Sequence, residues 1–346
     1  MQRRTLTLLL GTLLAFALAV AAAAVPVPYV ALGPGPAFDT LGTVRSSTGT
    51  TPLLKVTGRR TYPTTGMLDL TTVGVTDGIT LAEALRGWLS RGTEVVPREV
   101  LFPPSQTPAE VDKQNQADMV QSQNSATTAA LTQLGIVGTP YVAVGSVTTG
   151  GPASGTLKAG DILATVDGAA VSTPDQLRQR IGARTPGAKV TIGYLRQGAK
   201  RSAVLTTGHS SDTPARAVIG ISPQTGATFP VKVAISLQDV GGPSAGLMFA
   251  LGIIDKLTPG PLTGGRHIAG TGEISDDGKV GPIGGIAEKM IGAKKKGATV
   301  FLVPAANCAD ATASRPSGLQ LIKAGTLTQA LEGLRVLVAG GTPASC

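Results

Sequence analysis

The N-terminal segment is the feature that most constrains how this chain can fold. After Arg3 and Arg4, the 20 residues from Thr5 to Ala24 carry no charge, and the next charged residue is Asp39. At 1.5 Å per helical residue, such a run crosses the ~30 Å hydrocarbon core of a bilayer. The two arginines favour a cytoplasmic N-terminus, which places everything after about residue 28 on the outer side of the cell membrane.

A cleaved signal peptide is the alternative interpretation of this segment. Ala21–Ala24 offers the small-residue pattern of a cleavage site. We favour an uncleaved transmembrane anchor because apolar character continues through Val25–Leu32. Both interpretations export the rest of the chain.

Composition excludes several other classes of protein. Of the 346 residues, 15% are charged and 42% are apolar, so the chain is neither disordered nor a bundle of transmembrane helices, and its length suits two or three domains. Its 46 glycines and 24 prolines indicate many turns and hence a β-rich or mixed fold. The net charge of +9 is dispersed and aromatic residues are only 3%, which is unlike a nucleic-acid-binding surface. We therefore expect no nucleic-acid partner.

The two cysteines, Cys308 and Cys346, both lie near the C-terminus. Outside the cytoplasm such a pair can form a disulfide, and two unrelated thiols are the alternative. The chain has only two histidines, His209 and His267, and no H-E-x-x-H motif. We therefore expect neither a structural zinc site nor zinc-dependent proteolysis, and no cofactor.

A compact pattern of short strands and one well-marked helix lies between residues 135 and 208. Val142–Val147 alternates apolar and small residues as a strand does, and Asp167-Gly168 is a strong hairpin-turn signal. Thr173 is an N-cap followed by proline, and a glutamine three residues later completes a capping box. Leu177 and Ile181 lie four residues apart and form the buried face of this helix.

This order of elements resembles the PDZ domains of exported bacterial proteases. In that family an extended peptide adds as a strand to an exposed sheet edge beside the helix, and backbone N–H groups hold its C-terminal carboxylate. The resemblance implies a groove between Val142–Val147 and the helix Thr173–Gly182, with the carboxylate near residues 138–141. A scaffold module without a peptide ligand is the alternative. The residues implied in peptide binding are Gly138, Tyr141, Val142, Val144 and Leu177.

A glycine-rich turn at residues 239–246 precedes an apolar helix that we expect from about Leu247 to Leu257. Ser244 lies in this turn between small residues, and Gly242 and Gly246 leave room for a substrate backbone. At a helix N-terminus, free N–H groups and the helix dipole favour the negative charge that develops beside a serine nucleophile. Ser244 is therefore a candidate nucleophile, although a serine at a helix start is more often only a cap.

A serine nucleophile also needs a base, and the segment Gly281–Gly297 supplies one. Read as a helix, this segment puts Lys289 on the same face as Met290 and other apolar residues. Burial lowers the pKa of a lysine because low-dielectric surroundings disfavour the ammonium, so Lys289 can accept a proton. We expect Glu288 to be a solvated neighbour or an ion-pair partner, and Lys294–Lys296 to be a solvated helix end.

Three motifs in this half of the chain closely resemble the proteolytic domain of Lon-type proteases. They are G-P-S-A-G at residues 242–246, T-G-E-I at 271–274 and P-I-G-G-x-x-E-K at 282–289. The resemblance implies that Ser244 is the nucleophile, that Lys289 is the general base and that Thr271 hydrogen-bonds the lysine. The alternative mechanism uses His267 as the base of a Ser-His-Asp triad, but His267 lies in an expected loop and in no recognisable triad motif.

With the PDZ-like module and the anchor, nearly the whole chain resembles the PDZ-Lon family of exported, membrane-anchored bacterial proteases. We expect an α+β multidomain chain: a transmembrane helix at 1–28, a β-rich segment at 29–115, a PDZ domain at 116–209 and a Lon-type proteolytic domain at 210–346. Residues 29–115 can also contribute strands to the catalytic domain, which would make the PDZ domain an insertion.

The resemblance implies an ATP-independent serine endopeptidase, since the sequence contains no P-loop motif. Its expected partners are unfolded or membrane-associated exported proteins, peptide segments that the PDZ domain recruits or uses for gating, and the membrane itself. Assembly into a homo-oligomer is left open. The alternative function is a catalytically inactive PDZ adaptor or holdase.

Overall fold

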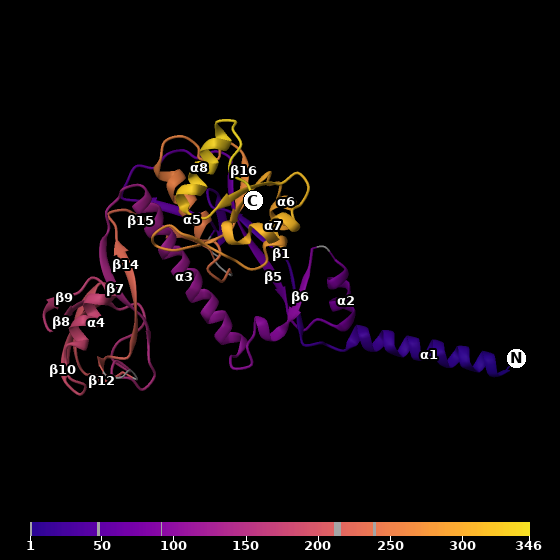
Figure 1. Ribbon diagram of the computed structural model, residues 1–346, viewed down its shortest axis with the longest axis horizontal. Coiled ribbons are helices and arrows are strands. Elements are labelled where there is room, and N and C mark those ends of the chain that lie inside the picture. The colour runs from indigo at the N-terminus through magenta and orange to yellow at the C-terminus, as the bar shows by residue number, and fades with distance from the viewer. Residues whose placement is uncertain (1, 47–48, 91, 211–215, 238–239) are drawn as a thin grey trace. The chain divides into compact units, whose positions relative to one another are not determined.

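The computed structural model describes residues 2–46, 49–90, 92–210, 216–237 and 240–346 (Figure 1). Asp239, the first residue of the glycine-rich turn, lies outside the described residues. The chain divides into two compact units: Met1–Leu134 together with Val231–Cys346, and Gly135–Pro230. The second unit is therefore an insertion between the two halves of the first. Its bounds differ at both ends from the 116–209 expected for the PDZ domain.

A six-stranded mixed sheet forms the centre of the first unit, in the order β20-β19-β16-β5-β1-β6. The strands are β1 (Tyr29–Asp39), β5 (Met67–Thr76), β6 (Glu94–Pro97), β16 (His267–Gly270), β19 (Val300–Pro304) and β20 (Gln320–Ala324). Strands β5, β16, β19 and β20 run parallel, whereas β1 is antiparallel to both of its neighbours. The N-terminal segment thus supplies half of the sheet.

Helices cover both faces of this sheet because side chains of the central strands alternate between them. Helices α6 (Ile286–Lys296) and α7 (Cys308–Ala313) share one apolar cluster with Phe301 of β19. Helix α5 (Gly246–Leu257) lies on the other face, where a Cβ placed on Gly270 would come within 2.7 Å of the Met248 sulfur. All five residues of β19 are buried.

The remaining elements of the first unit are short, apart from two helices. They are α1 (Gln2–Ala24), α2 (Leu81–Leu89), α3 (Pro108–Gln133), α8 (Leu327–Val338), the 3₁₀ turns η1 (Arg98–Val100) and η2 (Ala305–Asn307), and the strand pairs β2 (Thr43–Ser46) with β3 (Gly49–Pro52), β4 (Leu54–Thr57) with β15 (Lys232–Ile235), and β17 (Glu273–Ile274) with β18 (Val280–Gly281). Within α1, the stretch Arg4–Ala24 is long and apolar enough to cross a membrane; a signal sequence has the same length and composition.

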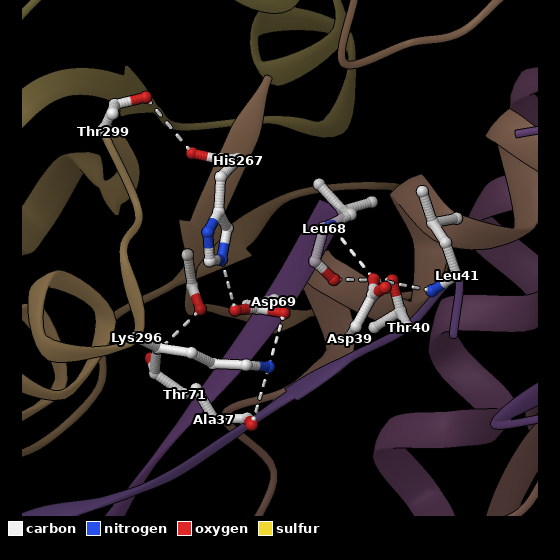
Figure 2. A network of polar contacts seen from close by, with 11 residues as sticks. Ala37, Asp39, Thr40, Leu41, Leu68, Asp69, Thr71, His267, Lys296 and Thr299 are labelled. Atoms are coloured by element: carbon white, nitrogen blue, oxygen red, sulfur yellow. Dashed lines mark hydrogen bonds and ion pairs between the residues drawn. The ribbon is translucent and has the colours of Figure 1, made fainter. Parts of the chain in front are cut away.

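A buried acid, Asp69 on β5, ties the sheet to the end of α6 (Figure 2). The Nε2 atom of His267 lies 2.7 Å from Asp69 Oδ2, and Lys296 Nζ donates hydrogen bonds of 2.9 Å to Asp69 Oδ1 and to the carbonyl of Ala37. One expectation is therefore wrong: His267 begins β16 rather than lying in a loop. Lys296 is exposed, as expected of a solvated helix end, and it also forms an ion pair with Asp69. A buried carboxylate requires such partners, because leaving it unpaired is costly.

The two cysteines are joined in a disulfide, with their Cα atoms 5.0 Å apart. Cys308 opens α7, so the bond fastens the C-terminal segment to the helical layer beside β19. A backbone hydrogen bond of 2.9 Å from Lys323 to Ala344 holds the same segment against β20.

The second unit is an antiparallel sheet with one helix. The sheet order is β11-β10-β8-β7-β14, and β9 pairs with β8. The elements are β7 (Thr139–Val147), β8 (Ile162–Val166), β9 (Ala169–Ala170), α4 (Pro174–Gly182), β10 (Lys189–Arg196), β11 (Ala199–Thr206), β12 (Gly208–His209), β13 (Ala217–Val218) and β14 (Ile221–Thr228). Thr173 caps α4, and Leu177 and Ile181 are buried, as the sequence predicts.

Candidate active site

The turn that carries Ser244 is hydrogen-bonded to α3, a helix that begins 136 residues before Ser244 in the chain. Gly242 has φ of 84°, a conformation that favours glycine, and its N–H donates a 2.8 Å hydrogen bond to the carbonyl of Asn115. Ser122 Oγ donates a 2.8 Å hydrogen bond to the carbonyl of Pro243. These two contacts fix the backbone of Gly242 and Pro243, the two residues that precede Ser244.

Gly246, the first residue of α5, allows this close approach. A Cβ at Gly246 would lie 2.7 Å from Ile274 Cγ2 and 2.9 Å from Ser122 Oγ, so no larger side chain fits without a shift. The Ser244 carbonyl accepts a 2.8 Å hydrogen bond from the N–H of Gly272, which couples the turn to the segment after β16. The supporting roles expected for Gly242 and Gly246 thus have a steric basis.

Lys289 and Ser244 meet in this site. Lys289 Nζ lies 2.9 Å from Ser244 Oγ and 3.2 Å from Thr271 Oγ1, and Thr271 Oγ1 donates a 3.0 Å hydrogen bond to the Ser244 carbonyl. Lys289 is only 3% exposed, and this burial lowers its pKa from 10.5 to about 8, although the charge of nearby Glu273 acts in the opposite direction. The lysine is therefore partly neutral near physiological pH, as a proton acceptor must be.

The start of helix α6 determines where Lys289 lies. Gly285 adopts a left-handed conformation with φ of 66°, which turns the chain into the helix. Just before it, Ile283 exchanges two 2.9 Å hydrogen bonds with the side chain of Asn307. The sequence patterns did not single out Asn307. The only signal for it is an asparagine that closely follows an apolar strand, where the structure shows it buried.

The expectation for Glu288 is wrong. Its side chain is 4% exposed rather than solvated, and burial raises its pKa. The Glu288 side chain lies beside Gly285: a Cβ placed on Gly285 would be 3.7 Å from the Oε2 atom of Glu288.

His267 lies at the wrong end of β16 to serve as the base. Thr271 follows the last residue of β16 and contacts Lys289, whereas His267 is the first residue of the same strand. Four residues of extended chain span about 13 Å. A Ser-His-Asp triad through His267 is therefore not supported, and its contact with Asp69 is structural.

The dyad opens into a cleft of about 940 Å³. Its walls are largely apolar, and Ser244, Lys289 and Glu273 lie together in its lining. Apolar lining residues include Leu32, Phe38, Val44, Met119 and Leu237. A cleft of this size with one reactive group accommodates several residues of an extended polypeptide. Among the described residues, no three His, Cys, Asp or Glu side chains are grouped to hold a metal ion.

The structure does not give β7 the free edge that the PDZ resemblance implied. Strand β7 is paired on both sides, with β8 and with β14, and Val142 and Val144 are buried in the core of the unit. Gly138 lies against the ring of Phe229 and Tyr141 against Gly226, at the end of β7 that pairs with the end of β14. Neither residue lines the groove beside α4.

The free edge beside the helix belongs to β14 instead. Within the described sheet, β14 pairs only with β7, and a groove of about 430 Å³ runs between the start of β14 and α4. Its lining includes Leu177, Arg178 and Ile181 from the helix and Ile219 and Ile221 from the strand side. Of the expected peptide-binding residues, only Leu177 lies here. The sequence patterns did not predict β14 as a strand.

Comparison with known families finds two matching domain models. Residues 231–332 match the model of the Lon protease (S16) C-terminal proteolytic domain, and residues 112–207 match that of the PDZ domain. Together with the Ser244–Lys289 geometry, the first match defines a serine-type peptidase domain of the Lon (S16) class. The chain carries this domain together with a PDZ domain.

Individual relatives match shorter stretches. Lon protease 2 of Herpetosiphon aurantiacus is 46% identical over 69 residues, which are 20% of this chain and 8% of that protein. Lon protease 1 of Sorangium cellulosum is 42% identical over 93 residues, or 26% of this chain and 11% of that protein. The chain therefore spans about a tenth of the length of these relatives. The PDZ domain of the SdrC-like protein from Listeria monocytogenes is 28% identical, with 24% of this chain and 85% of that chain covered and a TM-score of 0.23.

Proposed function

We propose that the chain is an endopeptidase that cleaves polypeptides with a Ser244–Lys289 dyad and without ATP. The observation that carries this proposal is the 2.9 Å contact between Lys289 Nζ and Ser244 Oγ at a buried site that lowers the pKa of the lysine to about 8. A neutral amine at that distance accepts the hydroxyl proton as Ser244 Oγ attacks the scissile carbonyl.

The rest of the cycle follows from the same geometry. Backbone N–H groups at the start of α5 stabilise the oxyanion, and the protonated Lys289 then donates its proton to the leaving amine. Water then attacks the acyl-enzyme by the same steps, with Lys289 again accepting and donating the proton, and Ser244 is released. Thr271 orients the lysine, since its hydroxyl accepts from Nζ and donates to the Ser244 carbonyl.

The remaining parts of the chain suggest where this activity occurs and on what. The apolar stretch Arg4–Ala24 would anchor the protein in the cell membrane, with its N-terminus in the cytoplasm and the peptidase domain outside. Without an unfolding motor, the substrates would be unfolded or membrane-associated exported proteins. The groove between β14 and α4 would recruit them by adding a substrate strand to the free edge of β14.

The test is proteolysis of an unfolded protein by the full-length chain in detergent, without ATP. We expect fragments from the wild type and at least about 10³-fold less from Ser244→Ala and from Lys289→Ala. Ser275→Ala is the matched control, because this serine lies in an exposed turn and its hydroxyl hydrogen-bonds only Asp277 and Lys279 among the described residues. A serine-reactive phosphonate should label Ser244 in the wild type but not in Lys289→Ala. Equal cleavage by Ser244→Ala and wild type would refute the dyad.

A further inference from the structure

Helix α2 presents its large apolar side chains to solvent and its small ones to the protein. Ala84 and Gly87 are buried, and a Cβ on Gly87 would come within 2.5 Å of Val95 on β6. The exposed residues are Leu81 (39% exposed), Leu85 (47%), Trp88 (52%) and Leu89 (89%). An ordinary surface helix has the reverse arrangement, with its apolar stripe against the core.

The exposed apolar residues form one continuous face. At 3.6 residues per turn, the positions 81, 85, 88 and 89 fall within an arc of about 100°, which is the width of an apolar stripe that docks on a partner. Arg86 lies on the flank of this arc and is exposed. Glu83 lies opposite the arc, and its carboxylate caps the helix start by accepting from Thr80.

The position of α2 indicates which partner this face meets. Its N-terminus is bonded directly to the chain that leaves α1: Leu81 donates to the carbonyl of Val25, and Val27 donates a 2.9 Å hydrogen bond to the carbonyl of Ile79. Figure 1 shows α2 beside the point where α1 joins the sheet. The face therefore begins where the apolar stretch Arg4–Ala24 ends, at the depth of the headgroups if that stretch spans a bilayer.

Trp88 suits this depth. Its ring packs edge-on against Tyr29, with the ring centroids 5.6 Å apart, and its Nε1 donates to the carbonyl of Val95. Tryptophan and tyrosine concentrate at membrane interfaces, where the apolar ring meets the acyl chains and the polar atoms stay hydrogen-bonded. The cationic flank at Arg86 complements anionic headgroups.

We propose that α2 is a membrane-contacting helix whose face Leu81–Leu85–Trp88–Leu89 lies in the lipid interface beside the anchor. The inference rests on the proposed membrane anchor and extends it: the sheet is not merely tethered by a flexible stalk but is seated on the bilayer through β6 and α2. The occupant is lipid rather than a second copy of the chain, because the face is continuous with the end of the membrane span.

The test uses Trp88, which is the only tryptophan of the chain and therefore reports its own environment. The full-length protein is reconstituted at one chain per nanodisc, in lipids that carry bromine at defined depths on the acyl chains. We expect emission shifted to shorter wavelength and quenching that is strongest for bromine about 5–10 Å below the headgroup boundary. The double variant Leu85→Gln/Leu89→Gln should lose most of this quenching. Val204→Gln, an equally exposed apolar position on β11, should leave it unchanged.

The other outcomes overturn the inference. Unquenched, water-like emission from a chain that co-floats with lipid would refute α2 docking while leaving the anchor intact. A spectral shift that requires two chains per disc and ignores bromine would assign the face to a second copy. A chain that does not float with lipid would refute the anchor and this inference together, whereas proteolysis measured in the same sample would still report on the dyad.

Discussion

Ser122 Oγ donates a 2.8 Å hydrogen bond to the carbonyl of Pro243, the residue before the nucleophile. We predict that Ser122→Ala lowers kcat about fivefold with little change in KM, because a lost hydrogen bond of about 1 kcal/mol loosens the turn that presents Ser244. Ser125→Ala on the same helix is the control, since its hydroxyl contacts only Gln121 among the described residues. Equal losses in both variants would mean that α3 contributes only stability.

The pKa of Lys289 predicts how activity depends on pH. Only the neutral amine can accept the serine proton, so with a pKa of about 8 the value of kcat/KM should rise about tenfold per pH unit below pH 8 and level off above it. The measurement is the pH–rate profile on a peptide without ionisable groups. A profile that is flat between pH 6 and pH 9 would contradict the assignment of Lys289 as base.

Glu273 provides a check on the cause of that profile. Its charge raises the pKa of Lys289 against the dominant effect of burial. Glu273→Gln should therefore shift the pH range in which kcat/KM rises, the rising limb of the profile, toward lower pH. Asp277→Asn removes the same charge from the exposed hairpin turn that follows β17 and should leave the limb in place. A shift of equal size in both variants would indicate a general charge effect.

Burial of Lys289 also has a predicted effect on stability. Its folded-state pKa of about 8 lies below 10.5, so between these pH values the unfolded chain holds more protons and stability increases with pH. Below pH 8 burial of the charged amine lowers the free energy of unfolding by up to about 3 kcal/mol. Lys289→Met should therefore be inactive but more stable than wild type at pH 7 in urea unfolding, and this gain should disappear above pH 10.5. Lys295→Met, at an exposed position, is the control.

The disulfide between Cys308 and Cys346 closes a loop with a sequence separation of 38. Chain-entropy arguments give about 4 kcal/mol for a loop of this length. We predict that Cys308→Ser/Cys346→Ser lowers the free energy of unfolding by this order, as does reduction of the wild type, with no direct effect on the dyad. Free thiols in the native, non-reduced protein, detected by alkylation, would contradict the pairing.

The proposed peptide groove predicts a charge effect on α4. Arg178 lines the groove, so Arg178→Glu should weaken binding of a peptide with a free C-terminal carboxylate about two- to fivefold, the range of an exposed ion pair. Arg180→Glu changes the same charge on the same helix outside the groove lining and should bind normally. The measurement is fluorescence anisotropy of a labelled peptide. Loss in both variants would point to net charge rather than to the groove.

The chemistry of the site was readable from local patterns. Glycines around Ser244 and a lysine on the apolar face of α6 are short-range signals, since turn conformation and helical periodicity depend on neighbouring residues. The same holds for the capped start of α4, which has the predicted threonine N-cap in the structure. These patterns predicted the candidate nucleophile, the candidate base and the helices that carry them.

Tertiary structure alone decided which elements lie together. The role of α3 beside the Ser244 turn depends on a hydrogen bond between residues 121 positions apart, which no local pattern encodes. Likewise the sequence predicts β7 as a strand, but only the pairing of the sheet shows that β7 is internal and that β14 has the free edge. Glu288 shows the same limit, because a charged residue is solvated or buried according to what the rest of the chain places over it. Sheet neighbours and burial are set by long-range packing, so local sequence patterns predicted the candidate reactive groups while the fold determined their surroundings.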